Sequence, residues 1–235
     1  MAITTILFDL DGTLLPMDQD LFVMTYLKGL AARVVPAGYE PTALIAAVWK
    51  GTEAMVHNDG SCLNEQRFWD TFTGLMGEKA LADMPLFEAY YREDFDKVRS
   101  VCGFETAAKE VIELVKAKGL RPVLATNPFF PAIATHKRVA WAGLQPEDFA
   151  YITTYENSRY CKPNPRYYQE ILETLQLRPE ECVMVGNDAT EDTAAAKLGI
   201  RVFLLTDCLI NKKNVDISVY PHGGFPELKA YIEAL

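Results

Sequence analysis

Short runs of apolar and β-branched residues recur along the chain and predict the strands of a parallel sheet. The runs cover residues 3–8, 122–125, 149–153, 182–185 and 202–205. Helical patterns separate the later runs, and apolar runs of this length are typical of parallel strands that are buried on both faces. The alternation predicts an α/β fold, in which helices cover a Rossmann-like parallel sheet on both sides.

Residues that begin or end helices support this interpretation. Gly119 ends the helical pattern over 104–118, and Asn164 is placed to cap a helix over 166–175. Glycine is common just after a helix because it adopts positive φ freely, and asparagine at a first turn accepts a backbone hydrogen bond. A third helix, rich in alanine, is expected from about Ala189.

The region 17–97 interrupts this pattern, because it contains no convincing strand. It shows four helical stretches, over 21–35, 42–57, 63–76 and 86–98. We therefore predict an α/β core made of 1–16 and 98–235, with an all-helical cap, 17–97, inserted after the first strand. Such a cap would stand over the carboxyl end of that strand, where open α/β sheets bind ligands.

Composition narrows the possible partners and the compartment. The chain has 235 residues and a formal net charge of -9, which disfavours nucleic acid because Lys and Arg drive that binding. Its five cysteines are odd in number and form no CxxC pair, which indicates a reduced compartment. No run is apolar enough for a membrane span or a secretory signal. We expect a cytoplasmic protein without a membrane partner, and the sequence does not indicate its oligomeric state.

Each of several predicted strands is followed by polar groups suited to phosphoryl transfer. These groups are Asp9 and Asp11, then Thr126 and Asn127, then Lys162, and finally Asp188 with Asp192. Taken singly, each is more typical of a turn, a helix cap or a solvated charge. Because parallel strands end at one edge of a sheet, we expect the four groups to converge. Thr126 and Asn127 are expected to open a helix whose N–H groups bind phosphate oxygens, and Asp188 and Asp192 to share one helix face.

These residues resemble the four motifs of the haloacid dehalogenase (HAD) superfamily, in the same order along the chain. The string DLDGT spans 9–13, Lys162 precedes a proline, and two acids four residues apart follow the later strand. The helical insertion is similar to the first-position (C1) cap of that family. One departure is visible, since Asn187 separates the glycine from Asp188 where many members have the acid directly after glycine.

The resemblance implies a magnesium cofactor. In such proteins the side chains corresponding to Asp9 and Asp188, and the backbone carbonyl corresponding to Asp11, reach the metal. A cluster of carboxylates would repel itself and a phosphate, so a hard divalent cation makes physical sense there. Asp192 would support the site, and the neighbouring Glu191 leaves its role open.

The resemblance also implies the chemistry of each residue. Asp9 would attack phosphorus and form an aspartyl-phosphate, and Asp11 would act as general acid and then as general base. Lys162 would bridge the nucleophile and the phosphoryl group, while Thr126 would hold a phosphoryl oxygen, with Asn127 beside it.

Several activities share these motifs. We predict hydrolysis of a small phosphorylated metabolite, a phosphomonoester, because Asp11 serves a leaving oxygen and a halide needs no such acid. A phosphomutase has the same core residues and is the first alternative. A phosphonatase would need a cap lysine, for which Lys28, Lys50 and Lys79 are available. A phosphoacceptor or binding module without turnover is the alternative from another class.

Overall fold

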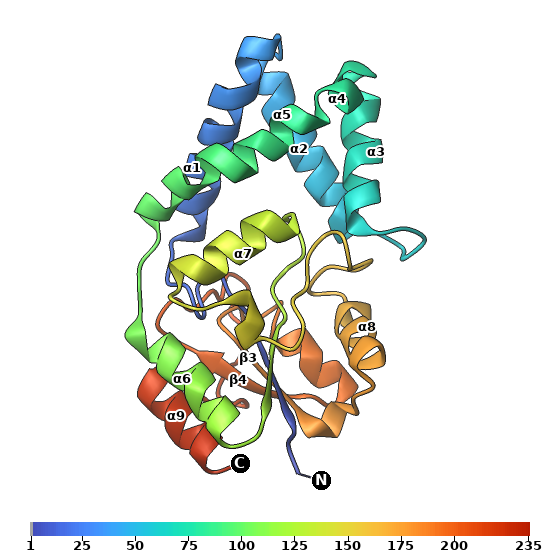
Figure 1. Cartoon of the computed structure of the whole chain (residues 1–235). Helices are drawn as coiled ribbons and strands as arrows, with labels where there is room; N and C mark the ends of the chain where they lie inside the picture. The colour runs from blue at the N-terminus through green and yellow to red at the C-terminus, as the bar shows by residue number, and fades with distance from the viewer. Residues whose placement is uncertain (1) are drawn as a thin grey trace.

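A five-stranded parallel sheet forms the centre of the computed structural model, which describes residues 2–235 (Figure 1). The strands are β1 (Thr5–Phe8), β2 (Arg121–Leu124), β3 (Cys182–Gly186), β4 (Arg201–Leu205) and β5 (His222–Gly223). Their spatial order is β2-β1-β3-β4-β5, and every neighbouring pair is parallel. The predicted α/β fold is confirmed.

Strand β1 lies between β2 and β3 and sets the position of the residue that follows it. Phe8, its last residue, pairs with Leu124 on one side and Val185 on the other. All four residues of β1 are buried. Asp9 therefore leaves the sheet at the same level as the residues that follow β2 and β3, which is the arrangement that the strand-end pattern predicts.

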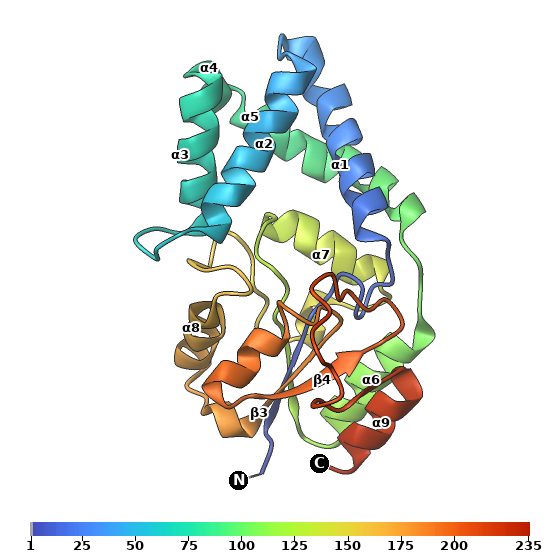
Figure 2. The same ribbon diagram turned by 180° about the vertical axis from the view of Figure 1, so that it is seen from behind.

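Helices cover both faces of the sheet. Their bounds are α6 (Thr106–Ala117), α7 (Ala132–Trp141), η4 (Pro146–Asp148), α8 (Pro165–Leu175), η5 (Pro179–Glu181), η6 (Thr193–Leu198) and α9 (Phe225–Glu233). Ile6 and Phe8 point into one apolar cluster and Leu7 into another, as side chains of a strand alternate between faces. In Figures 1 and 2, α6 and α9 lie together on one side of the sheet and α8 on the other.

The region between β1 and α6 is helical. Its elements are α1 (Gln19–Val34), η1 (Val35–Ala37), α2 (Pro41–Val56), α3 (Asn64–Met76), α4 (Lys79–Ala82), α5 (Met84–Ala89), η2 (Tyr90–Asp94) and η3 (Phe95–Val101). They stand above α7 and the rest of the molecule in Figure 1. Across the described part of the chain, every helix is too short or too polar to cross a membrane.

The chain enters and leaves this helical region at two segments that lie side by side. Met17 forms an antiparallel bridge with Cys102, and the Gly103 N–H donates to the carbonyl oxygen of Pro16 at 2.7 Å. This paired crossing lies near the boundaries at 17 and 97 that we predict for the cap. The division into two domains stays a prediction.

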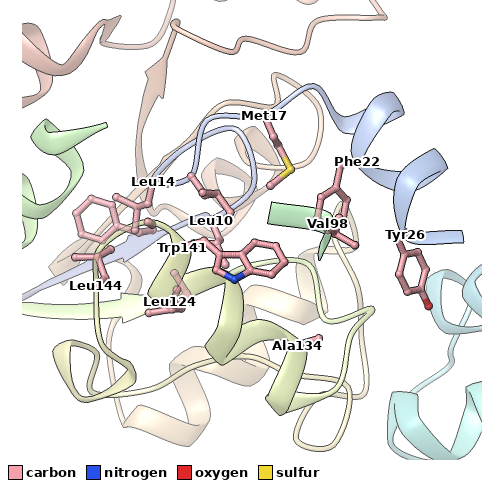
Figure 3. Close-up of a cluster of buried hydrophobic side chains, with 14 of the residues drawn as sticks. Leu10, Leu14, Met17, Phe22, Tyr26, Val98, Leu124, Ala134, Trp141 and Leu144 are labelled. Carbon is pink, nitrogen blue, oxygen red and sulfur yellow. The ribbon is translucent and has the colours of Figure 1, made fainter. Parts of the chain in front are cut away.

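One apolar cluster runs from the sheet into α1. Leu10 and Leu124 belong to it at the sheet, and Phe22 and Tyr26 belong to it on α1. Figure 3 shows the indole of Trp141 between these two groups. The first turns of α1 are therefore packed into the same core as the end of β1, which fixes the helix beside the loop that follows β1.

Two predicted elements differ in the structure. Residues 149–153 run beside β2, but only Ile152 pairs with it, at Leu124. The Pro122 carbonyl accepts from the Ala150 N–H at 2.9 Å, but Pro122 has no N–H to donate in return, so a second bridge does not form there. The alanine-rich helix expected from Ala189 is also shorter, because only η6, from Thr193, is helical and a turn precedes it.

Candidate active site

Asp9 lies directly after β1 and is almost completely buried, with 7% of its surface exposed. Its Oδ1 accepts a hydrogen bond from Lys162 Nζ at 2.9 Å, and its Oδ2 accepts one from Thr13 Oγ1 at 3.3 Å. Both partners stabilise the ionised carboxylate. Asp9 is thus held between an ammonium group and a hydroxyl group at the end of the central strand.

Lys162 is buried and is shared between two acids. Its Nζ lies 2.7 Å from Oδ1 of Asp192 as well as 2.9 Å from Asp9. Burial opposes the charge, but the Asp192 and Asp9 carboxylates outweigh it and raise the pKa of Lys162 well above its usual range. Burial in turn raises the pKa of Asp192 to about 6, against the effect of Lys162. The ammonium therefore connects Asp9 to Asp192.

Asp11 is paired with a buried arginine. Arg138, on α7, has no exposed surface and forms an ion pair with Asp11 Oδ2. The guanidinium also donates to Thr135 Oγ1 at 3.3 Å and lies 4.5 Å from the ring centroid of Phe130. Burial raises the pKa of Asp11 even though Arg138 opposes the shift. Oδ1 of Asp11 is buried and has no hydrogen-bond partner among residues 2–235.

Asp188 and Asp192 are joined by a turn and do not share a helix face, which corrects the prediction. Oδ1 of Asp188 accepts the N–H groups of Thr190 and Glu191 at 2.7 and 2.8 Å, and the Asp188 N–H donates to Asp192 Oδ2 at 2.9 Å. A Cβ on Gly186 would collide with the Asp192 carboxylate. Glycine at that position therefore lets Asp192 reach back under the loop toward Lys162.

Asn187 ties the loop after β1 to the loop after β3. Its Oδ1 accepts a hydrogen bond from Thr13 Oγ1 at 3.0 Å, and its Nδ2 donates to the carbonyl of Cys208 at 2.7 Å. Gly12 has a φ of +84°, and a Cβ there would collide with the Asn187 side chain. The extra residue that departs from the family pattern thus has a positional role.

Thr126 follows β2 as predicted and is buried, but it does not open a helix. The next helix, α7, begins at Ala132. Pro128 follows Asn127, and a residue before proline is disfavoured in the helical conformation, so the chain forms a bent loop up to Pro131. The expected phosphate site at a helix N-terminus is therefore wrong.

Asn127 connects Lys162 and Glu191. Its Nδ2 donates to Glu191 Oε2 at 2.9 Å, and its Oδ1 accepts the Lys162 N–H at 3.2 Å. Burial raises the pKa of Glu191 to about 8, with Lys162 opposing and nearby carboxylates adding to the shift. Asn127 thus contacts a neighbour of Asp188 on one side and the backbone of the buried lysine on the other.

A cavity of about 310 Å³ opens above these residues. Its lining includes six of the seven predicted site residues, namely Asp9, Asp11, Thr126, Asn127, Asp188 and Asp192. Lys162 is outside the lining and reaches it through its contact with Asp9. The structure therefore brings the predicted residues together at one edge of the sheet.

The charges at this edge favour a cation. Five acidic side chains face two basic ones: Asp9, Asp11, Asp188, Glu191 and Asp192 against Lys162 and Arg138. Within residues 2–235, no group of three or more His, Cys, Asp or Glu side chains is arranged around a metal position. Magnesium is commonly held by only one or two carboxylates plus water. The hard oxygen donors of Asp9 and Asp188, with a backbone carbonyl, fit such an ion.

Sequence patterns missed Arg138. An arginine in a helix usually projects into water, and Arg138 follows two polar residues, so it resembles a surface cation. Its spacing gives the only signal, because Ala134, Arg138 and Ala142 lie four residues apart and are all buried. An arginine on an apolar helix face needs a buried acid as partner.

The three cap lysines weighed for a phosphonatase do not line the cavity. Lys50 pairs with Glu53 at 2.6 Å, and Lys79 pairs with Asp83. Lys28 is exposed. None of these three lysines lies at the site, where it could form a Schiff base with a substrate carbonyl.

Comparison with known proteins identifies the family. The model of the haloacid dehalogenase-like hydrolases matches residues 3–199. The chain is 25% identical over 199 residues to the pyrophosphatase PpaX of Bacillus velezensis, covering 85% of this chain and 81% of the relative. The chain therefore belongs to the haloacid dehalogenase-like hydrolases.

Solved structures share the fold. A 2-haloacid dehalogenase from Pseudomonas syringae pv. tomato superposes with a TM-score of 0.64 at 19% identity, covering 99% of this chain and 98% of the other. The HAD hydrolase YfnB of Bacillus subtilis, solved bound to magnesium, superposes with a TM-score of 0.57 at 19% identity over 99% of each chain. At such identities the likeness concerns the fold.

Proposed function

We propose that this hydrolase is a magnesium-dependent phosphatase that cleaves a small phosphomonoester through an aspartyl-phosphate on Asp9. The observation that carries the proposal is the placement of Asp9 at the cavity floor, paired with Lys162 at 2.9 Å, with Asp11 two residues later. An anionic nucleophile beside a buried cation can approach a phosphate, because the cation offsets their repulsion.

The first step is attack by Asp9 on phosphorus. An Oδ atom of Asp9 bonds to phosphorus while the bond to the leaving alcohol oxygen breaks, which divides one hard displacement into two easier ones. Lys162 stabilises negative charge shared between Asp9 and the phosphoryl group. Thr126 and Asn127 line the same cavity, where Thr126 binds a phosphoryl oxygen through its hydroxyl group with Asn127 beside it.

Asp11 handles the proton in both steps. Its Oδ1 is buried without a partner while Arg138 holds Oδ2, so Oδ1 is the atom available for proton transfer. Asp11 protonates the departing alcohol oxygen and then takes a proton from the water that hydrolyses the aspartyl-phosphate. Arg138 acts as a positioning residue by fixing the Asp11 carboxyl group.

Magnesium would be held by the Asp9 and Asp188 carboxylates and the Asp11 backbone carbonyl, with Asp192 in a supporting role. When bound, it would neutralise phosphoryl charge. The excess of carboxylates at the sheet edge and the magnesium in YfnB support this assignment.

Asp11 favours a phosphatase over a dehalogenase. A halide leaves as an anion and needs no proton, whereas an alcohol leaving from phosphorus does. PpaX is named as a pyrophosphatase, which also cleaves a bond to phosphorus. A phosphomutase would use the same core residues, and no observation favours it here.

The partner is accordingly a small phosphorylated molecule and not a phosphoprotein, a nucleic acid or a membrane. Helices of the region between Gln19 and Val101 line the cavity together with the sheet edge. A phosphorylated side chain on a folded protein cannot enter a space of about 310 Å³ with its surrounding surface. We place the protein in the cytoplasm.

Release of inorganic phosphate tests the proposal. The purified chain is assayed with acetyl phosphate and p-nitrophenyl phosphate, with magnesium and then with excess chelator. We expect release that stops on chelation and returns with added magnesium. Magnesium-independent release, or none with either substrate, would contradict the proposal. Asp9→Asn serves as the background control.

A further inference from the structure

The walls of the cavity above the catalytic residues are aromatic. From α1, α2, α3 and the loop after β2, the side chains Phe22, Tyr26, Trp49, Phe68, Trp69 and Phe130 line it. Leu27, Leu30 and Val48 extend the same apolar surface. The floor is thus charged and the walls are apolar, so phosphate and alcohol parts of a substrate meet different surroundings.

No basic side chain lines this cavity within residues 2–235. Asp20 and Glu191 are the acidic groups that line it beside the four site aspartates, and none of the lining residues is Lys, Arg or His. A second anionic group on a substrate would lose water without gaining a cation, which is costly. Inorganic pyrophosphate, or a substrate with a carboxylate on its alcohol, therefore fits these walls poorly.

The aromatic walls are held by contacts of their own. The ring centroids of Phe68 and Trp69 lie 5.5 Å apart at 88°, and those of Tyr26 and Phe130 lie 5.1 Å apart at 74°. Edge-to-face pairs of this kind add to the stability gained by burial. The cavity is thus a preformed apolar space and not a gap between mobile side chains.

Polar groups interrupt this largely apolar surface, namely the hydroxyl groups of Tyr26, Tyr91, Tyr155 and Thr52 and the indole N–H of Trp69. The indole Nε1 of Trp69 is buried and lies outside regular hydrogen-bond geometry with every acceptor of residues 2–235, although the Tyr155 hydroxyl is close enough to interact with it. Because this atom has almost no exposed surface, a bound molecule meets the Tyr155 hydroxyl, which also lines the cavity, and not the indole N–H.

We propose that the substrate is a phosphomonoester of an alcohol with an apolar, aromatic group. The alcohol carries no second charge. This inference rests on the proposed function and names the class of its substrate.

Substrates with matched leaving groups test the class. The comparison is kcat/KM for 2-phenylethyl phosphate, ethyl phosphate, 2-phosphoglycolate and inorganic pyrophosphate, with magnesium present. 2-Phenylethyl phosphate and ethyl phosphate both release a primary alcohol. A difference in kcat/KM between them therefore reports binding of the aromatic ring. Because a single methylene in an apolar pocket changes discrimination by roughly tenfold or more, we expect at least about a tenfold preference for 2-phenylethyl phosphate over each of the other three.

A new cation in the wall should reverse part of this preference. Thr52 lines the cavity from α2, and its Oγ1 donates to the carbonyl of Val48 within the helix at 3.0 Å. Thr52→Lys should raise kcat/KM for 2-phosphoglycolate relative to 2-phenylethyl phosphate by about tenfold. Thr71 makes the same type of bond, to Arg67 at 2.9 Å, and does not line the cavity. Thr71→Lys is the matched control and should leave the ratio unchanged.

An exposed tryptophan provides a second variant with little risk to folding. Trp49 lines the cavity with 51% of its surface exposed, and Leu75 on α3 is 58% exposed and lies outside the lining. Trp49→Ala should lower kcat/KM for 2-phenylethyl phosphate several-fold more than kcat/KM for ethyl phosphate. Leu75→Ala should change neither.

Acetyl phosphate separates the two possible failures. It has an activated leaving group and no aromatic part, so it reports the chemistry at Asp9 alone. Hydrolysis of acetyl phosphate together with a preference for ethyl phosphate, 2-phosphoglycolate or pyrophosphate would overturn the substrate class only. Failure to hydrolyse acetyl phosphate would overturn the proposed function and this inference with it.

Discussion

The sheet edge carries buried charged side chains, whereas the helical wall above it carries mostly apolar ones. At the edge, buried charges contact one another directly, as Asp9, Lys162 and Asp192 do at 2.7 to 2.9 Å. In the wall, apolar side chains such as Phe68 and Tyr26 surround the cavity. Charge interactions depend steeply on distance in a buried setting, whereas apolar binding depends on area. This contrast is the basis of our proposal that the edge performs the chemistry and the wall selects the molecule.

The two regions also differ in how they are held. The edge is attached to three adjacent strands, so a shift of Asp9 would break the hydrogen bonds of β1 to both neighbours. The wall joins the core through two paired segments, at Met17 and Cys102, and through the apolar cluster around Phe22. Substitutions in the wall should therefore alter selectivity without altering the chemical step. Four predictions test this separation.

The largest effect is expected at the nucleophile. Asp9→Asn retains the shape but removes the anion that attacks phosphorus, so kcat for every substrate should fall at least about a thousandfold. Steady-state phosphate release measures the loss, and thermal unfolding checks that the variant is folded. A folded Asp9→Asn enzyme with parental rates would show that another residue is the nucleophile.

The next effect is expected at the shared cation. Lys162→Met removes the charge beside Asp9, and kcat should fall about a hundredfold to a thousandfold for all substrates alike. Lys212, which is 79% exposed in its side chain, supplies the control Lys212→Met. A loss confined to aromatic substrates would mean that Lys162 belongs to selection and not to chemistry.

A smaller and selective effect is expected at Asp11. Asp11→Asn should slow hydrolysis of ethyl phosphate about a hundredfold but p-nitrophenyl phosphate less than about tenfold, because only the alkoxide needs a proton. The rates are compared under single-turnover conditions, in which chemistry limits. Equal losses on both substrates would assign Asp11 a structural role.

The smallest effect on the chemical step is expected for a substitution of a buried residue behind the cavity wall. Phe72 is fully buried against Phe68, Trp69 and Phe87. Phe72→Ala should lower the free energy of unfolding by about 3 kcal/mol, measured by denaturant titration. Hydrolysis of acetyl phosphate by the folded fraction should change less than about threefold. A much larger loss would show that edge and wall are not separable.

The sequence carried enough information to place the site at the sheet edge. Strand ends are visible as apolar runs, and Asp9, Lys162 and Asp188 follow three of the runs. Parallel pairing then brings them together without knowledge of any contact. The apolar run at 149–153 predicts a strand, but the segment forms a single bridge to β2. An edge segment and a strand have similar compositions, so only the pairing with β2, which lacks an N–H at Pro122, distinguishes them.

The sequence did not reveal what depends on tertiary packing. In the sequence Arg138 resembles a surface residue, but in the structure α7 places it in contact with Asp11. The loop after Thr126 runs to Pro131 before α7 begins at Ala132, so Thr126 and Asn127 do not stand at a helix N-terminus. The aromatic residues of the helical region could be assigned to its core by spacing, but Trp49 and Trp69 also line the cavity. Direction of a side chain toward a shared space is not encoded by helical period alone.

Trapping the phosphoryl-enzyme tests the central claim most directly. The Asp11→Asn variant is mixed with acetyl phosphate and magnesium, quenched in acid, reduced with borohydride and mapped by peptide mass spectrometry. An acyl phosphate is reduced under these conditions while a free carboxylate is not, so the reduced residue marks the nucleophile. We expect reduction at Asp9, dependent on both acetyl phosphate and magnesium and absent when Asp9→Asn is added to the variant. Reduction at any other acid, such as Asp188 or Glu191, would contradict the account.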